Sequence, residues 1–245
     1  MTNNQNLFIS IIIPAYNEAK RISNVLNAIE EYFSQRTLPY EVIVVDDGST
    51  DITKEVVQDY QDRLQNLKII AHSPNKGKGY AVKQGMLAGQ GQYFLLTDAD
   101  NATPFEEIDK LLNWIKQDYP VVIGSRYLSD SNIVIRQSFY RRSLGRLANL
   151  IIQLLAVWGI KDTQCGFKCF ENNAAREIFK RQTIDGWGFD FEILAIARKL
   201  GYQIKEVPVS WQNVGDSRVR PIKSALKTLR ELLVIKVNLV RGKYE

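Results

Sequence analysis

The sequence predicts an α/β fold, with a mostly parallel central sheet, helices on both of its faces, and basic amphipathic helices at the C-terminal end. Short, nearly continuous apolar runs rich in β-branched residues recur along the first half of the chain, as expected of strands buried on both faces. Segments with helical spacing separate these runs. Strands that alternate with helices of this length indicate an open parallel sheet.

The first half is expected to form strands at residues 8–13, 41–45, 67–71, 93–97 and 120–123. The helices between them are expected at residues 18–33, 52–64, 79–88 and 104–117. The first helix shows the basis for these assignments, because Ile22, Val25, Leu26 and Ile29 repeat at intervals of three and four residues.

The second half is less regular. A basic stretch at 136–146 precedes an apolar segment at 147–160 and a loop at 162–166. Helices near 173–179 and 189–200, a strand at 204–209 and a basic helix from 221 to about 240 complete the chain. We expect one large domain over residues 1–212, with a basic and apolar segment at about 136–160, and a basic amphipathic extension over 213–245.

Composition excludes several kinds of chemistry. Ser-His-Asp and Cys-His mechanisms would both have to use His72, the only histidine, so acid–base work should fall to carboxylates. Cys165 and Cys169 are too few for a disulfide framework or a Cys/His zinc site, and we expect both thiols to be buried in a reducing compartment.

The net charge of +5 favours anionic partners. Nucleic acid is not expected, because the aromatic residues do not interleave with the basic ones as a single-strand platform requires. Residues 1–6 show no signal-peptide pattern, and the apolar segment 147–160 is too short to span a bilayer. The expected location is therefore cytoplasmic, with peripheral attachment to a membrane surface.

Polar clusters follow three of the predicted strands, at residues 14–18, 46–51 and 98–100, and should meet in one crevice. Asp98 and Asp100 are two residues apart, so in extended backbone both would project the same way. Such a pair suits a hard cation, Mg²⁺ or Mn²⁺, with a diphosphate completing its coordination. The alternative is a solvated turn in which an aspartate caps the following helix.

Two further clusters also have a plain structural interpretation. Asp46 and Asp47 begin a stretch that is typical of a tight turn whose Ser49 or Thr50 caps a helix, and turn and ligand contact are compatible there. Residues 75–79 offer small residues, two lysines and a helix N-terminus, which suit a phosphate. Taken alone, that segment is equally well explained as a loop.

Four of these motifs in order, at residues 11–18, 44–51, 75–79 and 98–100, resemble those of family 2 glycosyltransferases with the GT-A (Rossmann-like) fold. Residues 98–103, 124–126, 162–168 and 187–192 are more similar to the dolichyl-phosphate β-glucosyltransferase and polyprenyl-phosphate branch than to the mannosyltransferase branch. The resemblance extends from Phe8 to Lys243. It identifies residues 1–212 as a catalytic domain.

The resemblance implies roles for individual residues. Nucleotide-sugar contacts would come from Pro14, Ala15, Tyr16, Glu18, Asp46, Asp47, Lys76, Gly77, Asp98 and Arg218. Asp98 and Asp100 would hold the metal, and Arg126 would lie near the donor phosphates or the acceptor. The family's Gly-Ser-Lys near the C-terminus is replaced by Gly215-Asp216-Ser217-Arg218, and the N-terminal membrane anchor of eukaryotic members has no counterpart here.

The implied reaction is inverting transfer of a sugar, glucose from UDP-glucose, to a polyprenyl or dolichyl phosphate at a membrane surface. The alternatives are a GDP-mannose donor or a non-lipid acceptor. Asp162 and Asp190 are candidates for a catalytic base or for positioning the acceptor, although a phosphate acceptor, with a second pKa near ~6, needs no strong base.

Acceptor contacts are expected from Arg136, Arg141, Arg142 and Gln164. A cationic stretch joined to an apolar helix suits a lipid with an anionic headgroup, and the alternative is a core helix with a solvated basic approach. For the basic C-terminal helix two roles stay open, reinforcement of that surface and self-association into a homo-oligomer.

Overall fold

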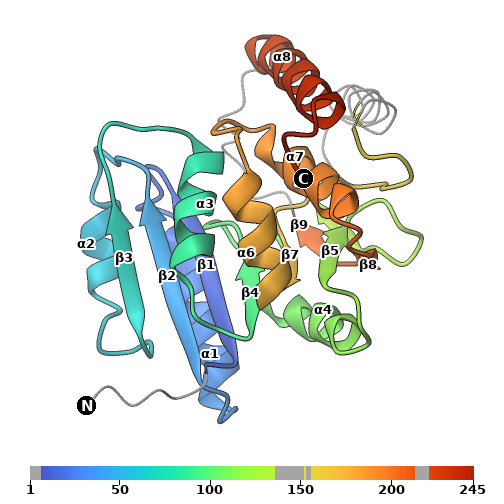
Figure 1. Cartoon of the computed structure of the whole chain (residues 1–245). Coiled ribbons are helices and arrows are strands. Elements are labelled where there is room, and N and C mark those ends of the chain that lie inside the picture. Colours follow the sequence, from blue (N-terminus) through green and yellow to red (C-terminus); the bar gives the residue numbers. More distant parts are fainter. Residues whose placement is uncertain (1–6, 136–151, 153–155, 213–220) are drawn as a thin grey trace.

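The structure is a computed structural model that describes residues 7–135, 152, 156–212 and 221–245, with backbone only for 133–135 and 221–226. A seven-stranded sheet in the order β3-β2-β1-β4-β7-β5-β8 forms its centre (Figure 1). These strands are β1 (Ile9–Ala15), β2 (Tyr40–Asp46), β3 (Leu67–Ala71), β4 (Tyr93–Leu96), β5 (Val121–Ser125), β7 (Lys168–Glu171) and β8 (Ile204–Pro208). All neighbours are parallel except β7, which runs antiparallel to both β4 and β5.

Helices cover both faces of the sheet, as predicted. One face carries α1 (Ile22–Ser34), α2 (Thr53–Gln58), the short 3₁₀ helix η1 (Phe105–Glu107) and α4 (Ile108–Ile115). The other carries α3 (Lys78–Ala88), α6 (Asn172–Arg181) and α7 (Phe189–Lys199), which Figure 1 shows toward the viewer. Helix α8 (Pro221–Val240) lies at the top of the same view and adds Leu232 and Ile235 to the core of that face.

Strand β1 shows how the sequence supplies two cores at once. Ile9, Ile11 and Ile13 belong to the core under α1 and α4, whereas Ile12 belongs to the core under α3 and α7. Because side chains alternate across a strand, an uninterrupted apolar run serves both faces.

Several element boundaries differ from the prediction. The first helix begins at Ile22, because residues 18–21 form a turn in which the Glu18 carbonyl accepts hydrogen bonds from the amides of Arg21 and Ile22. The helix expected at 52–64 ends at Gln58 and continues as turns. Strand β7 was not predicted, nor was the two-stranded sheet of β6 (Ile133–Ile135) and β9 (Trp211–Gln212). The strand at 67–71 and the helix at 221–240 are confirmed.

The topology determines where a ligand site can form. Strand β1 lies between β2 and β4, so the chain runs outward from β1 on one side and returns to its other side at β4. In open α/β sheets, ligands bind beyond the carboxyl ends of the strands at such a switch point.

Candidate active site

The loops after β1 and β2 are joined to each other by hydrogen bonds. The Asp47 amide donates to the Ala15 carbonyl at 2.8 Å, and the Asn17 amide donates to Ser49 Oγ at 2.8 Å. Asn17 adopts a positive φ of 55°, and its Oδ1 accepts the Thr50 amide at 2.7 Å. Two of the predicted clusters therefore lie together, with Pro14 and Ala15 buried in β1 and Tyr16 exposed beside them.

Asp47 organises the third loop. Its Oδ1 accepts His72 Nε2 at 2.6 Å and the Lys76 amide at 2.8 Å, while its Oδ2 accepts Asn75 Nδ2 at 2.7 Å and the Gly77 amide at 2.8 Å. The carboxylate is buried. Asp46 is buried too and accepts the Ser49 amide at 3.0 Å, so the predicted turn is confirmed there. The predicted cap is wrong, because α2 begins after Ile52 and the Thr53 amide donates to Asp51 rather than to Ser49 or Thr50.

Lys78 lies at the centre of the site, and sequence reasoning did not select it. Helix α3 begins at this residue, directly after Gly77, whose φ of 114° only glycine adopts readily. Lys78 Nζ lies 2.6 Å from Asp98 Oδ1. Burial would lower the pKa of Lys78, but Asp98, Asp190 and Asp100 outweigh it and raise that pKa, so the lysine stays charged.

Lys76, which the sequence predicted as a nucleotide-sugar contact, lies in a different environment. Its Nζ lies 3.1 Å from the Tyr80 hydroxyl and over the Tyr80 ring, and its main contribution is the backbone amide bound to Asp47. Lys78 is the first residue of α3 and reaches Asp98, whereas Lys76 lies two residues earlier in the loop.

Asp98 and Asp100 lie in a turn, so the extended backbone assumed for them was wrong. Asp100 Oδ1 accepts the Ala102 amide at 3.1 Å, and its Oδ2 lies 4.0 Å from Arg21 Nη1. Arg21 in turn holds Glu18 through bonds of 2.7 and 2.8 Å. Burial, and then the nearby charge of Asp98, raise the pKa of Asp100 above its ordinary value.

These two carboxylates fit a hard divalent cation. The charge of Asp98 adds to burial in raising the pKa of Asp100. Carboxylate oxygens held close together in this way suit Mg²⁺ or Mn²⁺. Gly166 lies directly against Asp98, since a Cβ on it would lie 2.0 Å from Asp98 Oδ2. Among the described residues no group of three or more His, Cys, Asp or Glu side chains is placed to hold a metal.

Asp162 is bound to Arg126 rather than poised as a base. Its Oδ2 accepts the Arg126 amide at 2.9 Å and Nε at 2.7 Å, and its Oδ1 accepts Nη2 at 2.9 Å. Burial would raise the pKa of the Asp162 carboxyl, but Arg126 outweighs it and lowers that pKa. This geometry favours the positioning role for Asp162 over the base role.

Asp190 is also ion-paired. It lies in the first turn of α7, buried, with its Oδ1 bonded to the Nζ of Lys168, a fully buried lysine on β7. Lys168 Nζ also donates to the Cys165 carbonyl. This ion pair favours a positioning role for Asp190 over a role as catalytic base.

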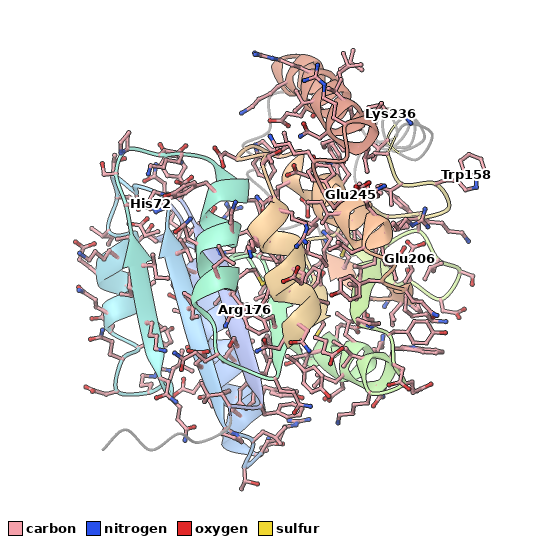
Figure 2. The ribbon with its side chains drawn as sticks, viewed as in Figure 1. His72, Trp158, Arg176, Glu206, Lys236 and Glu245 are labelled. Carbon is pink, nitrogen blue, oxygen red and sulfur yellow. The ribbon has the colours of Figure 1, made fainter. Side chains whose placement is uncertain are left out.

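Acceptor residues are only partly described. Gln164 is exposed in the loop that leads to Gly166. Arg136, Arg141, Arg142 and Arg218 lie outside the described residues, as does most of the 136–160 segment. Within that segment Ile152, Val157 and Ile160 are buried in the core, which supports the core interpretation for them, whereas Trp158 is 69% exposed and projects from the edge of the molecule (Figure 2).

Cys165 and Cys169 are free and buried, and burial raises their pKa values to about 11 and about 12. Over the described residues, no helix combines the length and hydropathy that crossing a bilayer requires.

Comparison with solved structures identifies the fold. Mannosyl-3-phosphoglycerate synthase from Rubrobacter xylanophilus superposes with a TM-score of 0.72 at 15% identity, covering 97% of this chain and 75% of that one. Glucosyl-3-phosphoglycerate synthase from Mycobacterium tuberculosis, in complex with Mn²⁺ and UDP-glucose, gives 0.67 at 17% identity, covering 94% and 78%. These matches confirm the GT-A fold.

Comparison with sequences identifies the family. The model described as Glycosyl transferase family 2 matches residues 10–179. The dolichyl-phosphate β-glucosyltransferase of Dictyostelium discoideum is 37% identical, with 97% of this chain and 76% of that protein aligned. The Homo sapiens protein of the same name is 33% identical, with 96% and 76% aligned. The chain therefore belongs to the family 2 glycosyltransferases.

Proposed function

We propose that this enzyme transfers glucose from UDP-glucose to a polyprenyl phosphate, with inversion at the anomeric carbon. Asp98, Asp100 and Lys78 carry the proposal, because they gather opposite charges at the β1/β4 switch point where a metal and a diphosphate would meet. The names of the relatives above supply the acceptor class and the sugar. The neighbour crystallised with Mn²⁺ and UDP-glucose supports the donor and the cofactor.

The donor would be held by the joined strand-end loops. Pro14, Ala15, Tyr16 and Glu18 would border the nucleoside. The amides of Lys76 and Gly77 donate to Asp47, which would hold that loop beside it. A divalent cation between Asp98 and Asp100 would neutralise charge on the departing diphosphate. Lys78 would place a further positive charge beside the same phosphates.

The chemistry needs little proton transfer. An acceptor phosphate oxygen would form the new bond to the anomeric carbon as the bond from that carbon to the diphosphate breaks, releasing UDP. A phosphate monoester, with a second pKa near ~6, is already largely ionised at neutral pH. Ion-paired Asp162 and Asp190 are consistent with such an acceptor, since no free carboxylate is required.

The acceptor would reach the enzyme from a membrane to which the protein attaches peripherally. Arg126, held in orientation by Asp162, and exposed Gln164 are the described candidates for its phosphate. Arg136, Arg141, Arg142 and Arg218 remain predicted contacts.

The test is product analysis with purified protein, a short soluble polyprenyl phosphate, Mg²⁺ or Mn²⁺, and either UDP-glucose or GDP-mannose. The proposal expects metal-dependent β-linked glucosyl product from UDP-glucose and little product from GDP-mannose. Mannosyl product would overturn the donor assignment. Turnover with a small non-lipid acceptor, and none with polyprenyl phosphate, would overturn the acceptor assignment.

A further inference from the structure

Helix α8 exposes an apolar stripe. Leu229, Leu233, Val237 and Val240 are 46%, 57%, 45% and 79% exposed. They follow one another at intervals of three or four residues, so they lie along one side of the helix. Apolar side chains gathered in this way on a surface mark a site of interaction.

Cations flank the stripe. The exposed positive residues of this segment include Arg230, Lys236, Arg241 and Lys243. Among the described side chains of α8 the only acid is Glu231, which is buried and accepts the Gly188 amide at 2.9 Å. An apolar stripe bordered by lysine and arginine, without exposed acids, is the pattern of a helix that lies in the plane of an anionic lipid interface.

The opposite side of α8 is fixed to the protein, so the stripe cannot turn inward. Leu232 and Ile235 are buried in the core shared with α7. After the helix, Tyr244 is fully buried, and its hydroxyl donates to Glu192 of α7 at 2.7 Å. Figure 2 shows Glu245 returning to α7, where it pairs with Lys199 at 2.8 Å, while Lys236 lies on α8.

The fixed side of α8 also borders the candidate active site. Glu231 holds Gly188, which closes the loop at residues 183–188. The backbone of this loop lies against the start of α3, since a Cβ on Gly79 would lie 2.5 Å from the Ile184 carbonyl oxygen. Trp187 of the same loop has its ring 5.2 Å from Lys78 Nζ. A surface that meets the outer side of α8 would therefore be separated from this loop by the width of one helix, about 10 Å.

We propose that the stripe of Leu229, Leu233, Val237 and Val240 docks on an anionic phospholipid surface and so brings the active site to lipid headgroups. This docking role rests on the proposed function, because a polyprenyl phosphate acceptor would be presented at the same lipid surface. A second copy of the chain fits the stripe less well, because pairing two such faces would bring their cationic flanks together.

The experiment measures co-sedimentation of the full chain with vesicles of phosphatidylcholine alone or mixed with phosphatidylglycerol. We expect binding that increases with the anionic lipid, falls with salt, and drops about tenfold or more in Leu233→Asp. Leu87→Asp, the same change at a residue 38% exposed at the far end of α3, is the matched control and should bind as the wild type does. Thermal unfolding and UDP binding check that both variants are folded.

Equal vesicle binding by Leu233→Asp and wild type, or binding indifferent to anionic lipid, would overturn the inference. So would a dimer that Leu233→Asp dissociates, which would assign the stripe to a second copy. Transfer to the short soluble acceptor by wild-type protein reports on the proposed function separately. Its failure with intact vesicle binding would sink that function and leave the docking surface standing.

Discussion

Lys78 is the residue on which donor binding should depend most among the positively charged groups. It neutralises a site that holds Asp98, Asp100 and Asp190, and it would contact the donor diphosphate. We expect Lys78→Gln to weaken UDP binding by roughly tenfold to a hundredfold, the usual effect of losing a charge-assisted hydrogen bond.

Lys76→Gln makes the same chemical change two residues away, where Nζ contacts Tyr80. The structure predicts that its effect on UDP affinity, measured by calorimetry, is much smaller. A larger loss in Lys76→Gln than in Lys78→Gln would restore the assignment made from sequence.

The charged Asp100 carboxylate should lower the free energy of unfolding, although the proposed metal site requires it. Its pKa is raised by burial and by Asp98, so above the ordinary aspartate pKa of about 4 the folded state binds more protons than the unfolded state. The free energy of unfolding therefore falls as pH rises through that window. Asp100→Asn removes this loss and keeps an oxygen for the Ala102 amide.

We expect Asp100→Asn to match or exceed the wild-type Tm at pH 7, by up to about 3 °C, while losing metal-dependent turnover. Thermal unfolding at several pH values from about 4 to 7 provides the measurement. A variant less stable than wild type at every pH would contradict this account of the Asp100 carboxyl.

Asp162 should matter for stability as well as for turnover. Asp162→Asn would leave the guanidinium of Arg126, with a side chain only 21% exposed, without its countercharge. Breaking such a buried pair costs about 3 kcal/mol or more of unfolding free energy, which urea unfolding would detect. Wild-type stability combined with lost turnover would instead support a direct catalytic role for this carboxylate.

At the scale of elements, the C-terminal end of the chain supports the loop beside Lys78. Glu192 accepts the Tyr244 hydroxyl at 2.7 Å and also the amide of Ile184 at 2.8 Å. Tyr244→Phe should therefore destabilise the protein by about 1–2 kcal/mol and speed amide exchange in residues 183–188.

Tyr60→Phe is the matched control, because it removes a hydroxyl bonded to Asn27 at 2.8 Å on the other face of the sheet. Hydrogen exchange followed by mass spectrometry should show faster exchange at residues 183–188 in Tyr244→Phe and unchanged exchange there in Tyr60→Phe. Equal exchange at 183–188 in Tyr244→Phe and wild type would refute the supporting role.

The elements also show what the sequence could and could not predict. Strands β1 and β2 were recognised because their apolar runs are continuous, and α8 because its period is regular over its full length. Strand β7 has only four residues and begins with buried Lys168, so it breaks the apolar pattern that marks a buried strand. The burial of Lys168 depends on its ion pair with Asp190, which lies 22 residues away and cannot be recognised from the local sequence pattern.

At the scale of the whole molecule, strand order converts local motifs into a site. The clusters at 14–18, 46–51 and 98–100 were predicted from their positions after strands, and the order β2-β1-β4 brings them together. Which charges pair could not be predicted in the same way. The pairs of Lys78 with Asp98 and of Arg126 with Asp162 join residues 20 and 36 positions apart, and only the folded sheet sets these distances.

We propose that Asp98 and Asp100 hold a metal that in turn holds the donor diphosphate. Calorimetric titration of UDP into wild type and Asp98→Asn, each with and without Mn²⁺, tests it most directly. We expect Mn²⁺ to tighten UDP binding to wild type by about tenfold or more and to have little effect in Asp98→Asn. UDP affinity that is the same with and without metal, or a metal effect that survives in Asp98→Asn, would contradict it.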